Sequence, residues 1–574
     1  ASDVYKRQVP LEPAHTHAHA HEHPHTQAHA HTHDTHTHAN ARSSSSDCND
    51  NAQARTSARH AHAHSNAQST PPEHTSMQGS ARPPSVDECA EQWEQTISKM
   101  SATSHKAELE HVRSALRNGG ISIHTTDDPD VKVIPNTPAV RRRQAMCKER
   151  VSYYMEICAL EELSDRPALL QPLHVVERAG RKPRLVLDLS RNLNDLIDSQ
   201  PFRHQSIDDA VAASTPGCFY GKMDLSDCFL SFDVHEDSRR YLAFELDGHF
   251  YRFKRLPFGL SSAPWWCEQF LAVIDFALRD AGVTHVRYCD DFLFIGPTAA
   301  SVRRAMDAAL KIFSAHGLRC NDSKTKWPVQ RITFLGLGLD SVQQVLFVPV
   351  DKVDDLQAGI GRMLARTHTT KWGLQSLVGK MSFVAKALPG ARPFFRSLID
   401  ATKGLPHPYA KQELSDAMRE DLVLWLRFIK GWNGRARWRR ADPIAITHDA
   451  SGDGFGFYLT HLPDGFDPRR LPLRLRPGSA FAGSFSQEHM QLNDRSIQYG
   501  ELLAVAVSVA MYAPYLRDQS LLVLSDNETD VHIINRQRTA SPPLLTLLRA
   551  VYRVCAEYNI DIRAQHLPGE DNYL

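Results

Sequence analysis

Two adjacent aspartates, Asp290 and Asp291, constrain the fold of this chain more than any other feature of its sequence. Val286-Arg-Tyr precedes the pair at short range, and Phe292-Leu-Phe-Ile295 follows it. Short apolar runs of this kind are typical of buried strands, so we expect the two acids at the tip of a hairpin. Carboxylates placed there repel each other and lose hydration unless a cation neutralises them. Mg²⁺, which prefers oxygen ligands, is the natural cation. For an isolated Asp-Asp pair, however, an acidic turn on a solvated hairpin is the commoner alternative.

The composition indicates an ordinary multidomain chain. The 574 residues are 42% hydrophobic and 23% charged, and they contain 66 Lys+Arg against 66 Asp+Glu. At roughly 100–200 residues per domain, this length predicts three or four domains. The net charge of zero gives no indication of a polyanionic partner. Since no run of about 18 apolar residues occurs, we expect no membrane-spanning segment.

The ten cysteines indicate a reducing environment. No two of them lie within four positions of each other. This spacing excludes Cys-x-x-Cys zinc modules and argues against a compact disulfide framework. We therefore expect an intracellular protein, in the cytoplasm, the nucleus or both.

The first 85 residues differ in composition from the rest. Fifteen of the 31 histidines lie between His15 and His74, separated mostly by Ala, Thr, Ser and Pro. Such a segment buries too little apolar surface to offset its conformational entropy, so we expect a disordered tail. Metal capture by the alternating histidines is an alternative. We favour a low-complexity tail, because no cysteine or carboxylate framework fixes a coordination geometry.

Periodicity gives a coarse view of the later elements. Residues 146–163 have apolar residues at helical spacing, and residues 241–253 read as a hairpin with an Asp247-Gly248 turn. Residues 351–430 are mostly of helical pattern. From Ile444 the pattern is strand, strand, helix, strand, helix, helix, strand, which indicates a separate α/β domain.

Six short motifs occur in a fixed order, and together they resemble the motifs of reverse transcriptases. They are Arg181-Lys-Pro-Arg-Leu-Val-Leu-Asp-Leu-Ser-Arg-Asn-Leu-Asn194, Lys222-Met-Asp-Leu-Ser-Asp-Cys-Phe229, Arg255-Leu-Pro-Phe-Gly-Leu-Ser-Ser-Ala-Pro264, Tyr288-Cys-Asp-Asp291, Leu318-Arg-Cys-Asn-Asp-Ser-Lys324 and Phe334-Leu-Gly336. The fourth is similar to the YxDD motif of that family. Because all six occur in the family's order, the solvated-turn alternative for the Asp-Asp pair is set aside.

The resemblance implies a multidomain α+β fold, in which a right-hand polymerase of fingers, palm and thumb precedes a ribonuclease H-like α/β domain. The expected boundaries are 1–85 for the disordered tail, 86–134 for an N-terminal extension, 135–340 for fingers and palm, 341–443 for thumb or connection, and 444–574 for the ribonuclease H-like domain.

The resemblance also implies how the palm acids act. Asp224, Asp290, Asp291 and the carbonyl of Leu225 would hold two Mg²⁺ or Mn²⁺ ions. Two such ions, ~3.5–4 Å apart, can activate a 3′-hydroxyl and stabilise the leaving pyrophosphate. Lys324 would protonate that leaving group.

A second set of residues is expected to contact the incoming nucleotide: Lys182, Arg184, Leu225, Phe229, Phe258 and Gly259. The cations suit triphosphate oxygens, although either alone could be a solvated charge on a strand. Gly259 would let the backbone approach substrate, although a lone glycine more often marks a turn. Phe229 would exclude a ribose 2′-hydroxyl, although a core Phe is the alternative. Asp227 is a weaker ligand candidate, and for Cys289 we favour simple packing.

A second group of acids lies in the C-terminal part. Asp449 ends a strand pattern, Glu501 opens a long helical stretch, and Asp526 ends the strand pattern Leu521-Leu-Val-Leu-Ser. Acids at strand ends and on a helix can converge on one metal pair. Asp526 alone would more often be a helix cap. The three in order resemble the ribonuclease H active site, which implies two more Mg²⁺ or Mn²⁺ ions.

The last motif departs from that family. Leu567-Pro-Gly-Glu-Asp-Asn572-Tyr-Leu574 is similar to the start of a PGxxNxxAD stretch. The fourth acid of the family would then lie about two residues past Leu574, and neither Glu570 nor Asp571 matches its position. We expect the ribonuclease H-like domain to be truncated here.

Residues 374–398 resemble the connecting segment of DIRS-like and gypsy-like LTR-type retrotransposon polyproteins, with DIRS-like favoured. Residues 371–440 contain 14 Lys+Arg against five Asp+Glu, with Trp432 and Trp438 among them. Basic residues interleaved with aromatics suit a template–primer track. A solvated charged helix with core tryptophans is the alternative.

The sequence therefore predicts an RNA-directed DNA polymerase that also degrades the RNA of RNA–DNA hybrids. Its expected partners are an RNA template, a DNA primer, the RNA–DNA hybrid and deoxynucleoside triphosphates, with no membrane. The alternative is a catalytically decayed element copy that only binds nucleic acid. An RNA-templated RNA polymerase is disfavoured by Phe229 and the second domain.

Overall fold

The computed structural model describes residues 89–100, 106–129, 134–178, 181–198, 200–388, 390–434, 436–437, 443–486 and 496–572. All of these belong to one compact unit, Pro83–Leu574. The predicted histidine-rich tail over 1–85 lies outside the described residues. None of the helices described is both long and apolar enough to cross a membrane.

Short helices and a small antiparallel sheet form the first region. The helices are α2 (Ala90–Met100), α3 (Lys106–Arg117), α4 (Pro138–Arg142), α5 (Gln144–Glu156), α6 (Ile207–Ala213) and α7 (Glu236–Arg239). The helix predicted over 146–163 is therefore confirmed only as far as Glu156. Cys158 has a φ of 57°, a left-handed conformation that a helix cannot continue through, and β1 follows at Leu160.

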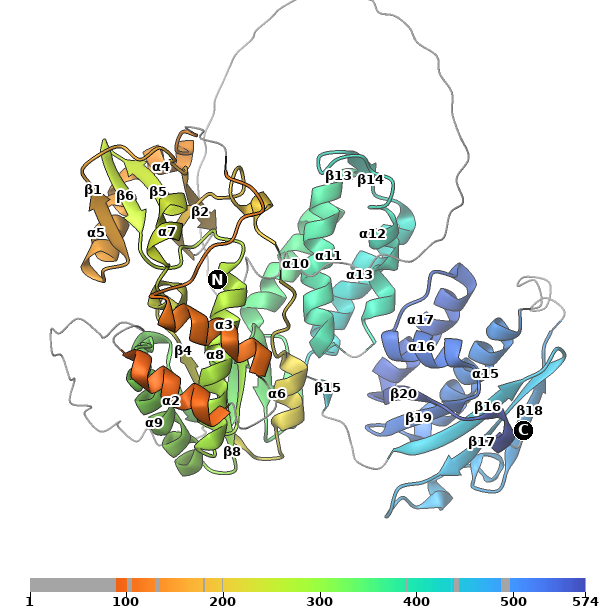
Figure 1. The fold of residues 1–574 in the computed structure, drawn as a ribbon. Helices are drawn as coiled ribbons and strands as arrows, with labels where there is room; N and C mark the ends of the chain where they lie inside the picture. Colours follow the sequence, from red (N-terminus) through yellow and green to blue (C-terminus); the bar gives the residue numbers. More distant parts are fainter. Residues whose placement is uncertain are drawn as a thin grey trace, which may run out of the picture. The chain divides into compact units, whose positions relative to one another are not determined.

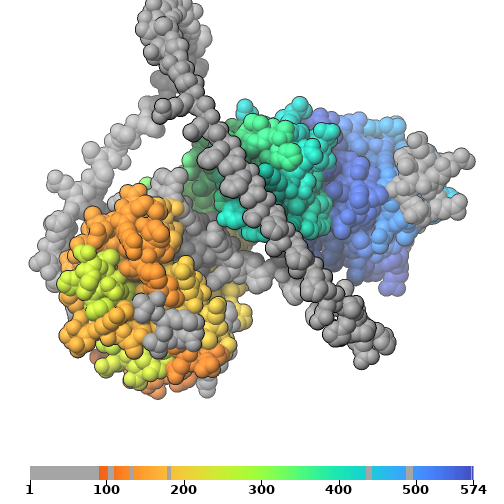
Figure 2. All heavy atoms as spheres, turned by 90° about the horizontal axis from the view of Figure 1, so that it is seen from above, coloured from red at the N-terminus to blue at the C-terminus, as the bar shows by residue number. Residues whose placement is uncertain are grey.

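The predicted hairpin over 241–253 is confirmed. Strands β5 (Ala243–Leu246) and β6 (His249–Phe253) pair around Asp247 and Gly248, which both have positive φ. Strand β1 (Leu160–Leu163) completes a sheet of order β1-β6-β5. In Figure 2 the orange and yellow-green surfaces of these segments adjoin. Strands β2 (Leu173–Arg178) and β3 (Arg181–Leu187) form a separate ribbon.

A four-stranded sheet of order β7-β8-β4-β9 forms the second region. Its strands are β4 (Phe219–Asp224), β7 (His285–Tyr288), β8 (Asp291–Gly296) and β9 (Lys326–Val329). Helices α8 (Ala263–Asp280) and α9 (Ala299–Ala315) pack beside it (Figure 1). Phe292–Ile295 is buried at every position, as expected of a strand covered on both faces.

The next region is mostly helical over 351–430, as predicted. Its helices are α10 (Val350–Leu364), α11 (Lys371–Val384), α12 (Arg396–Asp400) and α13 (Asp416–Gly431). Its strands are β10 (Arg331–Phe334), β11 (Leu337–Asp340), β12 (Val345–Phe347) and β15 (Ala436–Arg437) in one sheet, and β13 (His368–Thr370) with β14 (Lys411–Glu413) in another.

The C-terminal region is an α/β domain with a sheet of order β18-β17-β16-β19-β20. Its strands are β16 (Ile444–Ala450), β17 (Gly454–His461), β18 (Ala480–Ser484), β19 (Ser520–Ser525) and β20 (Asp561–His566), and its helices are α15 (Ile497–Tyr512), α16 (Glu528–Arg536) and α17 (Pro542–Tyr558). The predicted order lacked β18. That strand is an edge made largely of small, part-exposed residues, so its apolar signal is weak.

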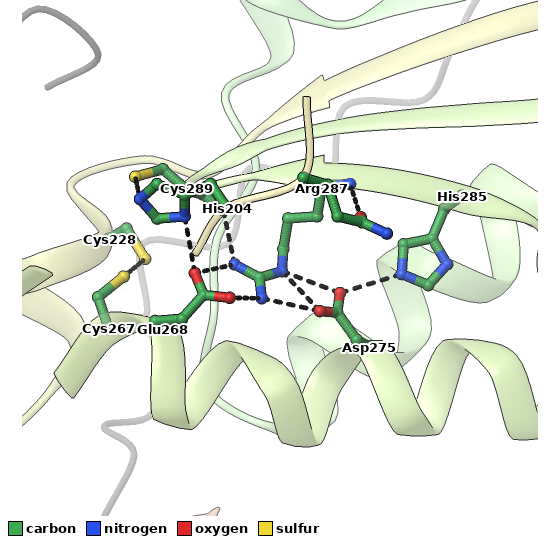
Figure 3. Close-up of polar contacts among 9 residues, drawn as sticks. His204, Cys228, Cys267, Glu268, Asp275, His285, Arg287 and Cys289 are labelled. Carbon is green, nitrogen blue, oxygen red and sulfur yellow. Dashed lines mark hydrogen bonds and ion pairs between the residues drawn. The ribbon is translucent and has the colours of Figure 1, made fainter. Parts of the chain in front are cut away.

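A buried arginine fixes the strand that leads to Asp290 and Asp291. Arg287 on β7 is 3% exposed, and its Nε donates to both carboxylate oxygens of Asp275 at 2.9 Å. Its Nη1 and Nη2 donate to Glu268 at 3.0 and 2.7 Å. Figure 3 shows the guanidinium between these two carboxylates, with His204 beside Glu268 and His285 beside Asp275. Both acids lie on α8, so the arrangement ties α8 to β7.

Charge is balanced locally in this network. Burial alone raises the pKa of Asp275, but Arg287 and His285 outweigh it and hold that pKa at about 2. The guanidinium Nη1 also donates to the carbonyl of Cys289 at 3.4 Å, directly before Asp290. The network therefore holds the turn as well as the strand.

We expect Arg287→Met to destabilise the protein by about 3–5 kcal/mol, because it leaves two buried carboxylates without a counter-charge. The measurement is the free energy of unfolding from urea denaturation followed by circular dichroism. Arg143→Met is the matched control: its pair with Glu177 is about half exposed, so its loss should change the free energy of unfolding far less than the loss of Arg287. Equal effects of the two substitutions would contradict a special role for the buried network.

Candidate functional site

The pairing of β4 with β8 brings two of the predicted acids together. Asp224 is the last residue of β4 and lies directly opposite Asp291, the first residue of β8. Asp290 occupies the two-residue turn between β7 and β8 with Cys289, whose φ is 54°. The predicted hairpin tip is thus confirmed, with Asp291 on the strand rather than in the turn.

Backbone hydrogen bonds fix the segments around these acids. The Leu225 amide donates to the carbonyl of Asp290 at 2.9 Å, and the Asn321 amide donates to the carbonyl of Asp224 at 2.8 Å. Leu225 also forms a bridge with Cys320. The three acids and the Lys324 segment are therefore tied together through main-chain groups, which side-chain substitutions leave in place.

Two lysines partly neutralise the acids. Lys324 Nζ lies 2.5 Å from Asp224 Oδ1, and Lys222 Nζ lies 3.0 Å from Asp291 Oδ1. No lysine or arginine among the described residues forms an ion pair with Asp290. Burial and the charges of Asp224 and Asp291 raise the pKa of Asp290 to about 6. Burial also raises the pKa of Asp291, with Lys222 opposing the shift.

These side chains fit a divalent metal ion. Carboxylates concentrated at one end of a buried sheet, with a raised pKa at Asp290, indicate negative charge in excess of its local compensation. Hard cations such as Mg²⁺ prefer carboxylate and carbonyl oxygens. Asp224, Asp290, Asp291 and the Leu225 carbonyl would hold the ions. Lys324 and Lys222 contact two of these acids, and the three acids do not form a compact three-atom cluster among the described residues.

The predicted nucleotide-contacting loop is held by the ribbon β2–β3. Gly259 has a φ of 116°, and a Cβ there would lie 1.8 Å from the carbonyl oxygen of Leu187. The Leu187 amide donates to Phe258 O at 3.0 Å, and Asn194 Nδ2 donates to Gly259 O at 2.9 Å. Position 259 therefore requires glycine because any side chain would clash with the backbone of Leu187. The predicted approach to substrate stays a prediction.

Phe229 lies next to this loop. Its ring meets that of Phe258 at a centroid distance of 5.4 Å in an edge-to-face arrangement, and it is 8% exposed. The preceding Asp227 has a φ of 45° and accepts a hydrogen bond from Tyr153 at 2.7 Å. Phe229 thus packs against Phe258 and lies two residues after Asp227, a half-buried polar residue.

The predicted cations are placed unequally. Arg184 is exposed on β3, free of the core. The side chain of Lys182 lies outside the described residues. Of the predicted basic track, Trp432 stacks on Phe428 at 3.6 Å between ring centroids, so it packs within the helical region. Trp438 and most of the arginines near it lie outside the described residues.

The second group of acids converges as predicted. Asp449 on β16, Glu501 on α15 and Asp526 after β19 each offer one oxygen, and these oxygens lie within 4.8 Å of one another. Parallel pairing of β16 with β19 brings Asp449 and Asp526 to the same end of the sheet. Glu501 lies in the second turn of α15, because that helix begins at Ile497 and not at Glu501 as predicted.

Negative charge also accumulates without a counter-charge around Glu501. Burial and the neighbouring acids Asp449 and Asp526 raise the pKa of Glu501 to about 8. Burial and the charge of Asp526 also raise the pKa of Asp449. Three converging carboxylate oxygens fit a divalent cation, and Mg²⁺ or Mn²⁺ would be held by these three residues.

The last motif reaches this group of acids. Asn572 Nδ2 donates to the carbonyl of His448 at 3.3 Å. Gly569 lies so that a Cβ there would be 3.7 Å from Asp526 Oδ2. The side chain of Asp571 lies outside the described residues, and Glu570 is exposed.

Sequence analysis missed several charged groups. Lys222 lies two residues before Asp224, and the period of two along a strand was the signal that both share a face. Asp530, in the first turn of α16, lies four residues after Asp526, and His448 precedes Asp449. Arg287 gave no signal, because its partners on α8 are distant in sequence.

Comparison with known proteins supports the polymerase assignment. Residues 177–339 match the family described as reverse transcriptase (RNA-dependent DNA polymerase). A putative enzymatic polyprotein of cassava vein mosaic virus is 23% identical over 418 residues, covering 71% of this chain and 59% of that protein. A retrovirus-related Pol polyprotein from transposon 412 of Drosophila melanogaster is 26% identical, covering 71% of this chain and 30% of that protein.

Similar solved structures include the foamy viral protease-reverse transcriptase in complex with an RNA/DNA hybrid. It has a TM-score of 0.48 and 14% identity, with 84% of this chain and 64% of that chain covered. The chain spans 59% of the length of the cassava vein mosaic virus relative, and 19% of the Gag-Pro-Pol polyprotein of human T-cell leukemia virus 2. The six ordered motifs, the family match and the polyprotein relatives agree, and residues 177–339 form a reverse transcriptase domain of the retroviral and retrotransposon Pol type.

Proposed function

We propose that this chain is an RNA-directed DNA polymerase of a retroelement, and that its C-terminal domain cleaves the RNA strand of RNA–DNA hybrids. The observation that carries the polymerase proposal is the pairing of Asp224 with Asp291, with Asp290 in the adjoining turn. The proposed substrates are an RNA or DNA template, a DNA primer and deoxynucleoside triphosphates. We propose an intracellular location for this activity.

The palm residues have distinct roles in this proposal. When bound, a pair of Mg²⁺ ions supplies activation of the 3′-hydroxyl and stabilisation of the leaving pyrophosphate. Asp224, Asp290 and Asp291 hold them, with the carbonyl of Leu225. Lys324, whose Nζ lies 2.5 Å from Asp224 Oδ1, would donate a proton to the leaving pyrophosphate.

Nucleotide selection rests on the loop that Leu187 and Asn194 support. Phe229 lies against Phe258, so its ring has little freedom to swing away from a sugar placed beside it. A fixed ring discriminates against a 2′-hydroxyl better than a mobile one, since rearrangement would relieve the clash. Arg184, exposed on β3, supplies a bidentate donor for triphosphate oxygens, and Lys182 adds a second positive charge.

Hybrid cleavage rests on Asp449, Glu501 and Asp526. Their converging oxygens favour metal-dependent attack of water on a phosphodiester. The two activities use separate acids, so each can be removed without the other.

Asp290→Asn should abolish extension of oligo-dT on poly-rA, by at least a hundredfold, while template–primer binding persists. The substitution removes a negative ligand and keeps the shape of the turn, whose backbone hydrogen bonds are unaffected. Asp322→Asn, an exposed acid near Lys324, is the control and should extend normally. Near-normal extension by Asp290→Asn would contradict the assignment of Asp290 as a catalytic metal ligand, whereas template–primer binding without extension by the parent protein would favour the alternative of a chain that only binds nucleic acid.

Phe229→Val should raise ribonucleotide incorporation relative to deoxyribonucleotide incorporation by about tenfold or more, because the smaller side chain leaves room for the 2′-hydroxyl. A tenfold change corresponds to ~1.4 kcal/mol less discrimination against the ribonucleotide. The measurement is the ratio of kcat/KM for the two precursors. Phe229→Tyr keeps the bulk and should leave the ratio unchanged. A core role alone would lower stability in the Val variant without moving the ratio.

Glu501→Gln should remove cleavage of a labelled RNA–DNA hybrid in Mg²⁺ by at least a hundredfold, and should leave primer extension intact. The variant removes one of three converging carboxylates without changing side-chain size. Asp453→Asn, exposed in the turn after β16, is the control and should cleave normally. If Glu501→Gln cleaves as fast as the parent protein, the acid cluster is not the cleavage site.

A further inference from the structure

Beside the proposed hybrid-cleavage acids lies a second cluster, which shares Glu501 with them and adds two residues that neither proposed activity uses. It consists of His448 on β16, Glu501 on α15 and Asp530 on α16, hereafter the inner cluster. Each residue offers one ligand atom, and these atoms lie within 4.8 Å of one another. His448 and Asp530 are fully buried, and Glu501 is 4% exposed.

The inner cluster is not satisfied by hydrogen bonds. Among the residues that the structure describes, no hydrogen-bond partner meets five buried atoms: both ring nitrogens of His448, both carboxylate oxygens of Asp530 and Oε2 of Glu501. His448 Nδ1 lies 3.9 Å from Glu501 Oε2, beyond hydrogen-bond distance. Five unsatisfied polar atoms in one buried place are costly, and such a group calls for an ion or water that completes it.

Glu501 connects the inner cluster to the outer acids. Its Oε1 accepts a hydrogen bond from the Ala450 amide at 3.3 Å, next to Asp449. Its Oε2 is the oxygen nearest His448. The two oxygens of one carboxylate thus face different partners, the Ala450 amide and the His448 ring.

The chemistry of the inner cluster selects the kind of ligand. Two carboxylates carry two negative charges, which one divalent cation neutralises inside a region of low dielectric. Metal bonds of ~2.0–2.2 Å would place ligand atoms roughly 3–4 Å apart, compatible with the observed grouping. An imidazole nitrogen suits Zn²⁺ or Mn²⁺, whereas Mg²⁺ prefers oxygen and retains water.

We propose that His448, Glu501 and Asp530 form a buried site for one divalent transition-metal ion, Zn²⁺ or Mn²⁺, distinct from the ions proposed at Asp449 and Asp526. Three protein ligands leave a fourth position open for a water molecule. The ion holds Glu501 Oε2 in place and so fixes the direction in which Oε1 faces the outer acids. Binding at this site does not depend on the proposed hybrid cleavage; only the orientation of Glu501 for catalysis rests on it.

The test compares melting temperatures of the full chain in EDTA, Mg²⁺, Mn²⁺ and Zn²⁺. The variants are Asp530→Asn, His448→Asn and, as control, Asp526→Asn, which removes an outer acid and leaves all three ligands of the inner cluster in place. The histidines of residues 1–85 are identical in all four proteins, so their metal binding cancels. In the parent protein and in Asp526→Asn, Mn²⁺ or Zn²⁺ should raise the melting temperature above its value in Mg²⁺. Asp530→Asn and His448→Asn should lose that difference.

A second measurement keeps the proposal falsifiable if His448→Asn fails to fold. After equilibrium dialysis against Mn²⁺ or Zn²⁺, Asp530→Asn should retain one ion fewer per chain than the parent protein. In EDTA, Asp530→Asn should be at least as stable as the parent, because it removes an uncompensated buried acid. Unchanged stoichiometry, or equal destabilisation in EDTA and in metal, would overturn the proposal and indicate a purely structural polar cluster. Loss of hybrid cleavage in Asp526→Asn alone bears only on the proposed function.

Discussion

The antiparallel pairing of β4 with β8 is the constraint on which the polymerase site depends. It sets Asp224 opposite Asp291, and the tight turn before β8 adds Asp290. Like charges at the end of a sheet are unfavourable, and this sheet tolerates them because Phe292–Ile295 is buried over its whole length. Apolar burial holds the strands in register, and a one-residue slip would move every side chain of β8 to the other face. The same burial that stabilises the sheet raises the pKa of Asp290 and prepares the acids for a cation.

Two treatments of buried charge occur within a few residues of each other. At Arg287 the charge is compensated inside the protein: one guanidinium meets two carboxylates of α8, and the pKa of Asp275 is held at about 2. At Asp290, in the turn that follows the strand of Arg287, charge compensation is incomplete and the pKa of the carboxyl is raised. The first arrangement gives rigidity, because each partner is costly to remove. The second arrangement, at Asp290, leaves negative charge that a bound cation would neutralise. The buried network therefore gives the turn that carries Asp290 a rigid support.

Sequence reasoning predicted the features that local patterns encode. Asp224, Asp290 and Asp291 were located because acids interrupt apolar strands there, and the hairpin around Asp247-Gly248 because its turn chemistry is local. The convergence of Asp449, Glu501 and Asp526 followed from strand ends and their order. Features set by distant contacts were missed. β18 is an edge with little apolar signal, and helix α5 ends early at a left-handed Cys158 that no composition rule marks. Gly259 was assigned to substrate approach, yet its clearest requirement is the backbone of Leu187, which lies 72 positions away in sequence.

The C-terminal domain extends this contrast between compensated and uncompensated charge. Asp421 in the helical region is buried but is paired with Arg549 and accepts a hydrogen bond from Ser397, so its charge is met within the chain. Asp530 is buried just as deeply and meets no donor among the described residues. A single hydrogen-bond donor beside Asp530 would give it the kind of partner that Asp421 has. The missing donor at Asp530, beside an equally unpaired His448, is therefore best understood as a place that a cation fills, with Glu501 as the shared side chain between structure and chemistry.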